Sequence, residues 1–160
     1  SKDEDEEKDT TTALEGTWKT ECYTNSDNTS SIITPTFAGN VLTIKDEKHS
    51  DTSCATDFRL MEESHTFAMG DSGKFTITSG TTKRTPQSSA AVTAYNSANK
   101  CSANDWELNT VKDCTVAENS QGDNYYCLYG LSGTTLYIKC DGDVHPTSIP
   151  ITAENTFTKQ

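Results

Sequence analysis

Six cysteines in a chain of 160 residues constrain the possible fold more than any other feature of this sequence. An even number of cysteines in a small domain predicts disulfide bonds, which persist in oxidising compartments but not in the cytosol. We therefore expect an extracytoplasmic protein, located in the periplasm or at the cell surface. The cysteines are Cys22, Cys54, Cys101, Cys114, Cys127 and Cys140.

A low content of apolar residues makes such cross-links important. Only 32% of the residues are hydrophobic, whereas threonine occurs 27 times. Threonine is β-branched and tolerates water, so it favours strands without adding much to a core. Each disulfide can contribute about 2–4 kcal/mol, and the net stability of a domain is only roughly 5–15 kcal/mol. We therefore expect the fold to depend on its disulfides.

The last two cysteines flank a turn that bears on their pairing. A two-residue turn at Gly133-Thr134 would place Cys127 directly opposite Cys140 in a hairpin. A shift of the turn by one residue would place Ile138 opposite Cys127 instead, and six cysteines allow fifteen pairings in all. Among these we predict the pairs Cys22–Cys54, Cys101–Cys114 and Cys127–Cys140.

Negative charge is concentrated at the N-terminus. The net charge is −11, of which residues 1–9 carry −4 through six acidic residues and two lysines. Such a block cannot bury apolar area, so residues 1–12 are predicted to be a disordered acidic tether and residues 13–160 to form one domain. The segment is similar to the linker of bacterial lipoproteins, which follows a lipidated cysteine. We expect an outer-membrane lipoprotein, with an ordinary secreted protein as the alternative.

The charge distribution also limits the partners. No basic stripe is present, so binding to nucleic acid and attraction to anionic lipid are not expected. Contact with a membrane is expected only through the lipid anchor, and the protein is expected to be a monomer. An acidic surface does suit a cationic protein partner.

Short segments of alternating hydrophobicity indicate an antiparallel β protein. Strands are predicted at residues 14–22, 32–37, 41–45, 58–61, 65–69, 74–78, 106–110, 125–131, 136–140, 149–152 and 156–159. One segment differs, because Thr85-Pro86 has the form of a helix N-terminus and apolar residues follow at helical spacing. This predicts a short helix over residues 86–98.

The segment Leu14-Glu15-Gly16-Thr17-Trp18-Lys19 resembles the first strand of lipocalins, which carries a Gly-x-Trp motif. Later features are similar to those of small bacterial lipocalin-like lipoproteins, namely residues 91–96, Asp105-Trp106, residues 133–138, Pro146-Thr147-Ser148 and Phe157-Thr158-Lys159. The resemblance implies a mainly β, antiparallel up-and-down barrel of eight strands, with Trp18 at its closed end. The helix in mid-chain and the number of cysteines differ from the classical lipocalin pattern.

Aromatic residues at alternating strand positions are the candidate ligand-binding residues. They are Trp18, Phe75, Trp106, Tyr125 and Tyr129, and we expect several of them to point into the barrel. A barrel of eight strands is either filled by its own side chains or holds one small ligand. The sequence leaves both arrangements open, together with a sandwich that has no central cavity.

The sequence contains no motif for catalysis or metal binding. The three histidines have no metal-ligand spacing, and neither Cys-x-x-Cys nor Gly-x-Ser-x-Gly occurs. Asp141-Gly142-Asp143 is interpreted as a turn, since the other ligands of an EF-hand loop are missing. We therefore predict that the protein is not an enzyme and has no metal or other cofactor.

Two classes of function are consistent with these observations. In the first, the barrel carries or senses a small apolar ligand, which contacts the aromatic residues. In the second, the barrel has no ligand pocket and is a surface interaction protein, such as an adhesin, an assembly factor or an inhibitor of a cationic enzyme. Its loops would then make the contacts, and its acidic charge would steer the association.

Overall fold

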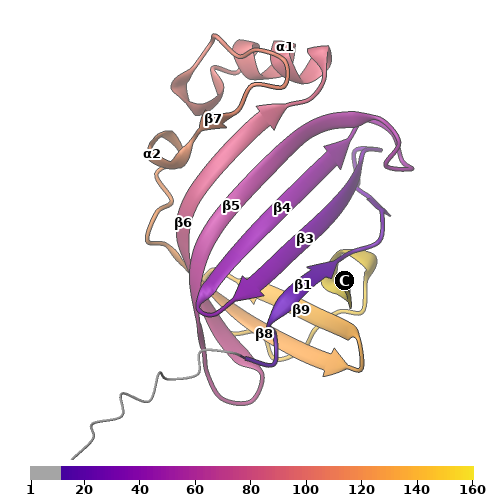
Figure 1. The fold of residues 1–160 in the computed structure, drawn as a ribbon, viewed down its shortest axis with the longest axis vertical. Coiled ribbons are helices and arrows are strands. Elements are labelled where there is room, and N and C mark those ends of the chain that lie inside the picture. Colours follow the sequence, from indigo (N-terminus) through magenta and orange to yellow (C-terminus); the bar gives the residue numbers. More distant parts are fainter. Residues whose placement is uncertain (1–11) are drawn as a thin grey trace, which may run out of the picture.

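Eight antiparallel strands close into a barrel in the computed structural model, which describes residues 12–160 (Figure 1). Each strand pairs with its neighbour in chain order, and β1 completes the ring by pairing with both β3 and β10. The predicted fold class is confirmed as a mainly β, antiparallel up-and-down barrel, compatible with a lipocalin-like fold. The barrel strands are β1 (Gly16–Lys19), β3 (Ser30–Ala38), β4 (Val41–His49), β5 (Asp57–Met69), β6 (Lys74–Pro86), β8 (Asn124–Ser132), β9 (Thr135–Asp141) and β10 (Thr156–Lys159).

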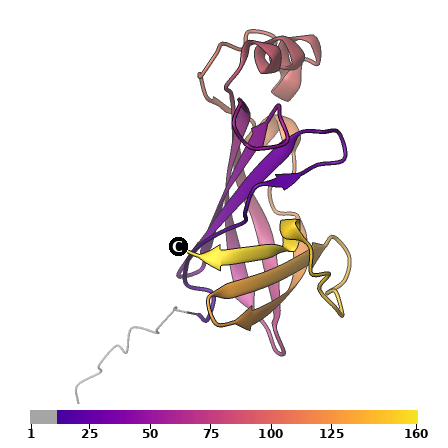
Figure 2. The same ribbon diagram turned by 90° about the vertical axis from the view of Figure 1, so that its right-hand side faces the viewer.

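The remaining elements lie outside this ring. The strand β2 (Tyr23–Thr24) pairs with β3, and a short 3-10 helix, η2 (Ala153–Asn155), precedes β10. The other elements form a cap over residues 89–118 at one end of the barrel, in which the helix that follows β6 lies beyond the end of that strand and the later elements lie beside its last residues (Figures 1 and 2). The cap contains α1 (Ser89–Ser97), the 3-10 helix η1 (Lys100–Ser102), β7 (Lys112–Asp113) and α2 (Thr115–Glu118).

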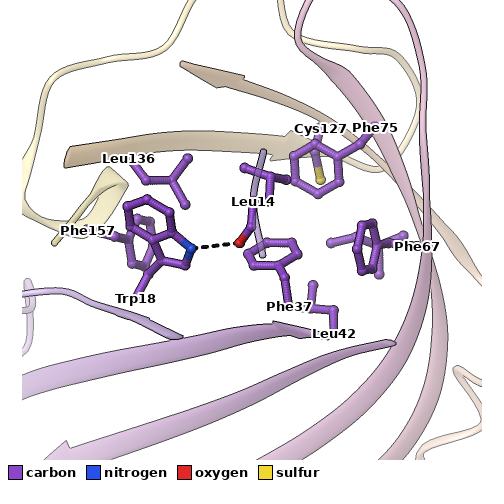
Figure 3. Packing of buried hydrophobic residues seen from close by; sticks show 10 residues of the cluster. Leu14, Trp18, Phe37, Leu42, Phe67, Phe75, Cys127, Leu136 and Phe157 are labelled. Atoms are coloured by element: carbon purple, nitrogen blue, oxygen red, sulfur yellow. Dashed lines mark hydrogen bonds between the residues drawn. The ribbon is translucent and has the colours of Figure 1, made fainter. Parts of the chain in front are cut away.

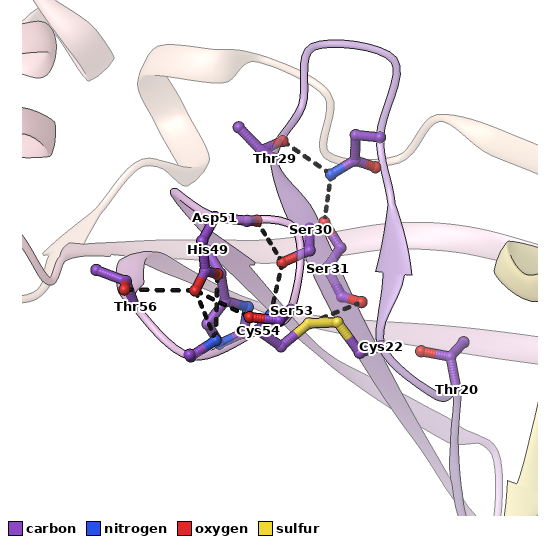
Figure 4. Close-up of a disulfide and its surroundings, with 12 residues drawn as sticks. Thr20, Cys22, Thr29, Ser30, Ser31, His49, Asp51, Ser53, Cys54 and Thr56 are labelled. Carbon is purple, nitrogen blue, oxygen red and sulfur yellow. Dashed lines mark hydrogen bonds between the residues drawn. A yellow bond between two sulfur atoms is a disulfide. The ribbon is translucent and has the colours of Figure 1, made fainter.

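All three predicted disulfides are present, Cys22–Cys54, Cys101–Cys114 and Cys127–Cys140. Cys127 and Cys140 are directly opposite in the β8–β9 hairpin, as the turn at Gly133-Thr134 predicts. Cys22–Cys54 ties the segment after β1 to the β4–β5 loop, where the Ser30 hydroxyl accepts a hydrogen bond from the Cys54 N–H (2.9 Å) and donates one to the Asp51 carbonyl (2.7 Å) (Figure 4). The bonds indicate an oxidising, extracytoplasmic environment.

A cluster of buried apolar residues, here called the aromatic core, fills the end of the barrel opposite the cap (Figures 1 and 3). The Phe37 ring lies edge-on to those of Phe67 (5.2 Å between centroids) and Phe75 (6.1 Å), and the Trp18 indole donates a hydrogen bond to the Leu14 carbonyl (2.8 Å). The members are Leu14, Trp18, Phe37, Leu42, Phe67, Phe75, Ile77, Cys127, Leu136 and Phe157. This end of the barrel is therefore filled by its own side chains.

The glycine of the Gly-x-Trp motif has a physical role at this end. Gly16 has a φ of 116°, a conformation that side chains with a Cβ rarely adopt, and a Cβ there would lie 3.0 Å from Cε of Lys159. The Lys159 ammonium lies over the Trp18 ring, 4.9 Å from its centroid, and donates a hydrogen bond to the Glu15 carbonyl. Gly16 thus lets Lys159 cover Trp18.

Several predicted elements differ from the structure. The helix is capped by Ser88, whose hydroxyl accepts the Ala91 N–H (3.1 Å), whereas Pro86 ends β6. Residues 58–61 and 65–69 belong to one strand, β5, because the intervening glutamates stay in the ladder with β4 and β6. Residues 149–152 form no strand, and of the predicted first strand, residues 14–22, only β1 (Gly16–Lys19) is a strand.

The predicted acidic tether, residues 1–12, lies outside the described residues except for Thr12, so its boundary stays a prediction. Within residues 12–160, the longest helix has nine residues, and none has the length and apolar character needed to span a bilayer.

Candidate ligand-binding site

The inward face of the barrel changes from apolar to charged toward the cap. On β4, the inward positions run from Leu42 in the aromatic core through Ile44 to Asp46. The cross-strand partners on β5 are, in the same order, His65, Glu63 and the apolar Met61. Because side chains alternate along a strand, these residues all face the same interior. Polar groups therefore line the half of the barrel that the aromatic core leaves open.

A cavity of about 420 Å³ occupies this half. Its volume lies within the range of about 300–1,000 Å³ that small-molecule sites have. Residues of five barrel strands contribute, together with α2 and the segment that follows it. The lining consists of Ile44, Met61, Glu63, His65, Ile77, Ser79, Thr82, Arg84, Glu118, Ser120, Tyr125 and Cys140.

A histidine and a glutamate form one polar wall of the cavity. The Gly80 N–H donates a hydrogen bond to Nδ1 of His65 (3.1 Å), so Nε2 carries the proton and donates to Glu63 (2.6 Å). The strand register shifts between Ser64 and Thr66, and a Cβ at Gly80 would lie only 2.1 Å from the Ser64 carbonyl oxygen. A glycine is therefore required for the bulge that orients His65. Both ring nitrogens of His65 are hydrogen-bonded. The His65–Glu63 pair is therefore a structural part of the cavity wall, and His65 has no free ring nitrogen to act as a base.

An arginine and a glutamate form a second polar part of the wall. Arg84 on β6 donates from Nε to the carboxylate of Glu118 (2.5 Å), the last residue of α2. Both side chains are mostly buried. Burial lowers the pKa of the Arg84 guanidinium, but the hydrogen bond and charge of Glu118 outweigh it, and the pKa is raised above its ordinary value. The guanidinium is therefore a permanent positive charge at the cavity wall.

A third ion pair lies farther from the core. Arg59 donates two hydrogen bonds to Asp46, one to its carboxylate (2.8 Å) and one to its backbone carbonyl (2.9 Å). The Tyr23 side chain lies in the same region. Its burial, followed by the charges of Asp46 and Glu154, raises the pKa of the phenol above its ordinary value of 10.0. Tyr23 therefore remains an uncharged hydroxyl at neutral pH.

The predicted ligand-binding residues fall into three groups. Trp18, Phe75 and Tyr129 belong to or pack against the aromatic core, so they form the floor and not an open pocket. Tyr125 lines the cavity and is 40% exposed. Trp106 does not lie in a barrel strand, which corrects the expectation that it lines the barrel wall.

Trp106 instead stabilises the cap. Its ring packs edge-on against Tyr95 (4.9 Å between centroids), in a cluster with Cys114. Its backbone N–H donates to the side chain of Asn96 (2.8 Å), and its indole donates to the Lys100 carbonyl (3.0 Å). These contacts replace the strand ladder that the alternation at residues 106–110 predicted.

Two other features were considered as sites. Cys101, Cys114 and Glu118 place possible ligand atoms within 4.8 Å of one another, but both sulfurs are joined in a disulfide and are not free thiolates. A hollow of about 320 Å³ lies on the outer face of β3–β6 and is lined largely by outward hydroxyl groups, such as those of Thr36 and Thr43. Its threonines are outward-facing strand residues.

No motif in the sequence predicts the charged lining of the cavity. Arg84 and Glu118 are 34 positions apart, and β6 and the cap bring them together. The alternation of β5 and β6 was the one available signal, since it places Met61, Glu63, Thr82 and Arg84 on one face. No family model matches the chain, and no curated protein matches it either.

Proposed function

We propose that the protein is an extracytoplasmic, non-enzymatic carrier or sensor that holds a small, largely apolar ligand in the barrel. The observation that carries this proposal is the cavity of about 420 Å³ above the aromatic core. Its floor is apolar, formed by Ile44 and Ile77, and Tyr125 adds an aromatic wall. A mostly apolar hollow with a few oriented polar groups is the usual form of a small-molecule site.

The proposal includes a lipocalin-like lipoprotein tethered to the outer membrane by its acidic N-terminal segment. Three disulfides support the compartment, and the closed barrel supports the resemblance to lipocalins. Mass spectrometry of the protein isolated from its own cells tests the anchor, since a diacylglyceryl group adds a defined mass to the N-terminus. Isolation of the protein only in an unlipidated form would refute this part of the proposal.

Native mass spectrometry of the unreduced protein tests ligand binding directly. We expect an extra mass that is lost on denaturation, and saturable binding of the neutral fluorescent probe N-phenyl-1-naphthylamine. Tyr125→Ala should weaken probe binding at least about fivefold, because aromatic stacking area is lost. Tyr126→Ala is the matched control, since Tyr126 is next in the strand but packs against His145 instead. Equal effects of the two variants, or no saturable binding, would refute the proposal.

One observation favours the second function, that of a surface interaction protein. The cap exposes apolar side chains close together in sequence, Leu108, Val111 and Val116, and the last is 89% exposed. Combined with a net charge of −11, this surface suits a basic partner. Binding to a small basic protein that falls steeply with salt, and that Val116→Asp reduces, would support this function over a ligand carrier.

A further inference from the structure

The cavity has a polarity gradient along its depth. Ile77 at the floor belongs to the aromatic core, whereas Arg84, farther along the same strand, lies toward the cap. Met61 is the cross-strand partner of Arg84, so an apolar side chain adjoins the charge. A ligand that matches this gradient has an apolar tail and one polar end.

Arg84 has donors to spare for such a polar end. An arginine side chain has five N–H groups, and Glu118 accepts only the one on Nε. Tyr95 also interacts with this guanidinium, which still leaves terminal N–H groups. These groups have the fork geometry that binds a carboxylate with two parallel hydrogen bonds.

The two members of this ion pair differ in how firmly they are held. Arg84 belongs to a long barrel strand that is paired on both sides, with β5 and β7. Glu118 ends a helix of only four residues, and Val116 of that helix is almost fully exposed. The disulfide of Cys114 and the hydrogen bond from Thr82 to Thr115 hold the N-terminal end of this helix, whereas Glu118 lies at its C-terminal end. Glu118 is therefore the member of the pair that a competing anion would displace.

The other carboxylates of the interior already have hydrogen-bond partners on barrel strands. The Glu63 carboxylate already accepts from His65 on the same strand, and Asp46 accepts twice from Arg59. Their partners lie on barrel strands and not on the short cap helix. Arg84 is thus the charge whose counter-ion is most easily replaced.

We infer that the ligand is an amphipathic carboxylate, whose head group binds Arg84 in place of Glu118 and whose tail lies toward Ile77. This inference rests on the proposed ligand-carrier function and specifies its ligand class. In it, Glu118 occupies the head-group position in the absence of ligand.

Octanoate, octanol and octylamine test this inference, because they share one tail and differ only in the head group. Their affinities are measured by displacement of N-phenyl-1-naphthylamine from the unreduced protein. We expect octanoate to bind about tenfold more tightly than octanol, and octylamine to bind no better than octanol, since a charge-assisted bidentate pair is worth at least one factor of ten.

Three variants assign the effect to the proposed residues. Glu118→Gln should tighten octanoate binding several-fold and leave octanol unchanged, because it removes the competing carboxylate. Arg84→Gln should abolish the preference for octanoate. Arg59→Gln is the matched control, an arginine on the neighbouring strand that does not line the cavity, and it should retain the preference. Circular dichroism shows whether each variant is folded, and the gain expected for Glu118→Gln holds even if Arg84→Gln does not fold.

The outcomes separate this inference from the proposed function. Equal binding of octanoate and octanol, tightest binding of octylamine, or weaker octanoate binding by Glu118→Gln would overturn the carboxylate inference and leave the cavity as a ligand site. A lack of binding of all three compounds and of the probe would overturn the proposed function as well.

Discussion

Between Leu42 and Asp46 the inward face of β4 passes from a fully buried aliphatic side chain to a carboxylate, and the two halves of the barrel differ accordingly. The half opposite the cap is filled by aromatic rings in mutual contact. The half beneath the cap holds ion pairs around an open cavity. The same strands build both halves, so the first half can supply stability while the second remains free to bind.

The largest expected effect comes from emptying the aromatic core. Phe37→Ala should lower the free energy of unfolding by about 3–5 kcal/mol, because Phe37 is buried among other rings. Met61→Ala in the cavity wall should cost about 1 kcal/mol or less, since its neighbours already border open space. Urea denaturation of the two variants measures the difference.

Probe binding should show the reverse order for the same two variants. Met61→Ala is expected to weaken binding of N-phenyl-1-naphthylamine, whereas folded Phe37→Ala should bind as the wild type does. If Phe37→Ala loses binding while still folded, the two halves are not independent, and the comparison between them fails.

How well the sequence predicts each half of the barrel depends on the sequence separation of the residues that contact one another there. The Cys127–Cys140 pair followed from one local turn, and Trp18 followed from a motif in which Gly16 has a definite steric role. Glu63 lies between the predicted strands 58–61 and 65–69, whereas the structure places it within β5. Its partner His65 lies two positions away on the same face and donates a hydrogen bond to its carboxylate.

The errors in the cap have a related cause. The alternation at residues 106–110 contains only two apolar residues, Trp106 and Leu108, too few to outweigh the packing of Trp106 on Tyr95. Arg84 and Glu118 meet through tertiary structure alone. The local sequence pattern was therefore sufficient to predict the core half. The cavity could not be predicted in this way, because it depends on residue pairs that only the folded chain brings together.

Two disulfides of equal sequence separation allow a matched test of the halves. Cys101–Cys114 and Cys127–Cys140 both span 13 positions, so the loop-entropy model assigns each about 3 kcal/mol. Replacing Cys127 and Cys140 by alanine should lower the free energy of global unfolding by about that amount, because the bond joins two barrel strands. Replacing the other pair should mainly loosen the cap.

Hydrogen exchange distinguishes these two results. In the Cys101→Ala/Cys114→Ala variant, faster exchange should be confined to residues 89–118, with a smaller change in global stability. Equal acceleration across the barrel strands would show that the cap and the barrel unfold as one unit.

The bulge in β6, opposite His65, marks the boundary between the two halves, and Gly80 makes it possible. Gly80→Ala should cost about 1–3 kcal/mol, because the added Cβ meets the Ser64 carbonyl oxygen and the strands must separate. Probe binding should fall too, since the hydrogen bond that orients His65 is lost. Gly130→Ala on β8 is the control, as a Cβ there meets no atom within 4 Å, and it should be close to neutral. Similar losses of stability and probe binding in both variants would show that replacing any strand glycine has this effect, and not only the glycine at the bulge.

The smallest effect is a pH dependence that the cavity half alone should show. The pKa of Tyr23 is raised by burial and by the carboxylates of Asp46 and Glu154, so the folded protein holds this proton more tightly than the unfolded chain does. Stability from this source is complete below pH 10 and is lost as the pH rises above it, because the unfolded chain then releases the proton first. Tyr23→Phe should flatten this decline in thermal unfolding at alkaline pH. If the thermal stability of the wild type and of Tyr23→Phe declines equally with rising pH, another group causes the alkaline sensitivity. The carboxylates of Asp46 and Glu154 would then not control the titration of Tyr23.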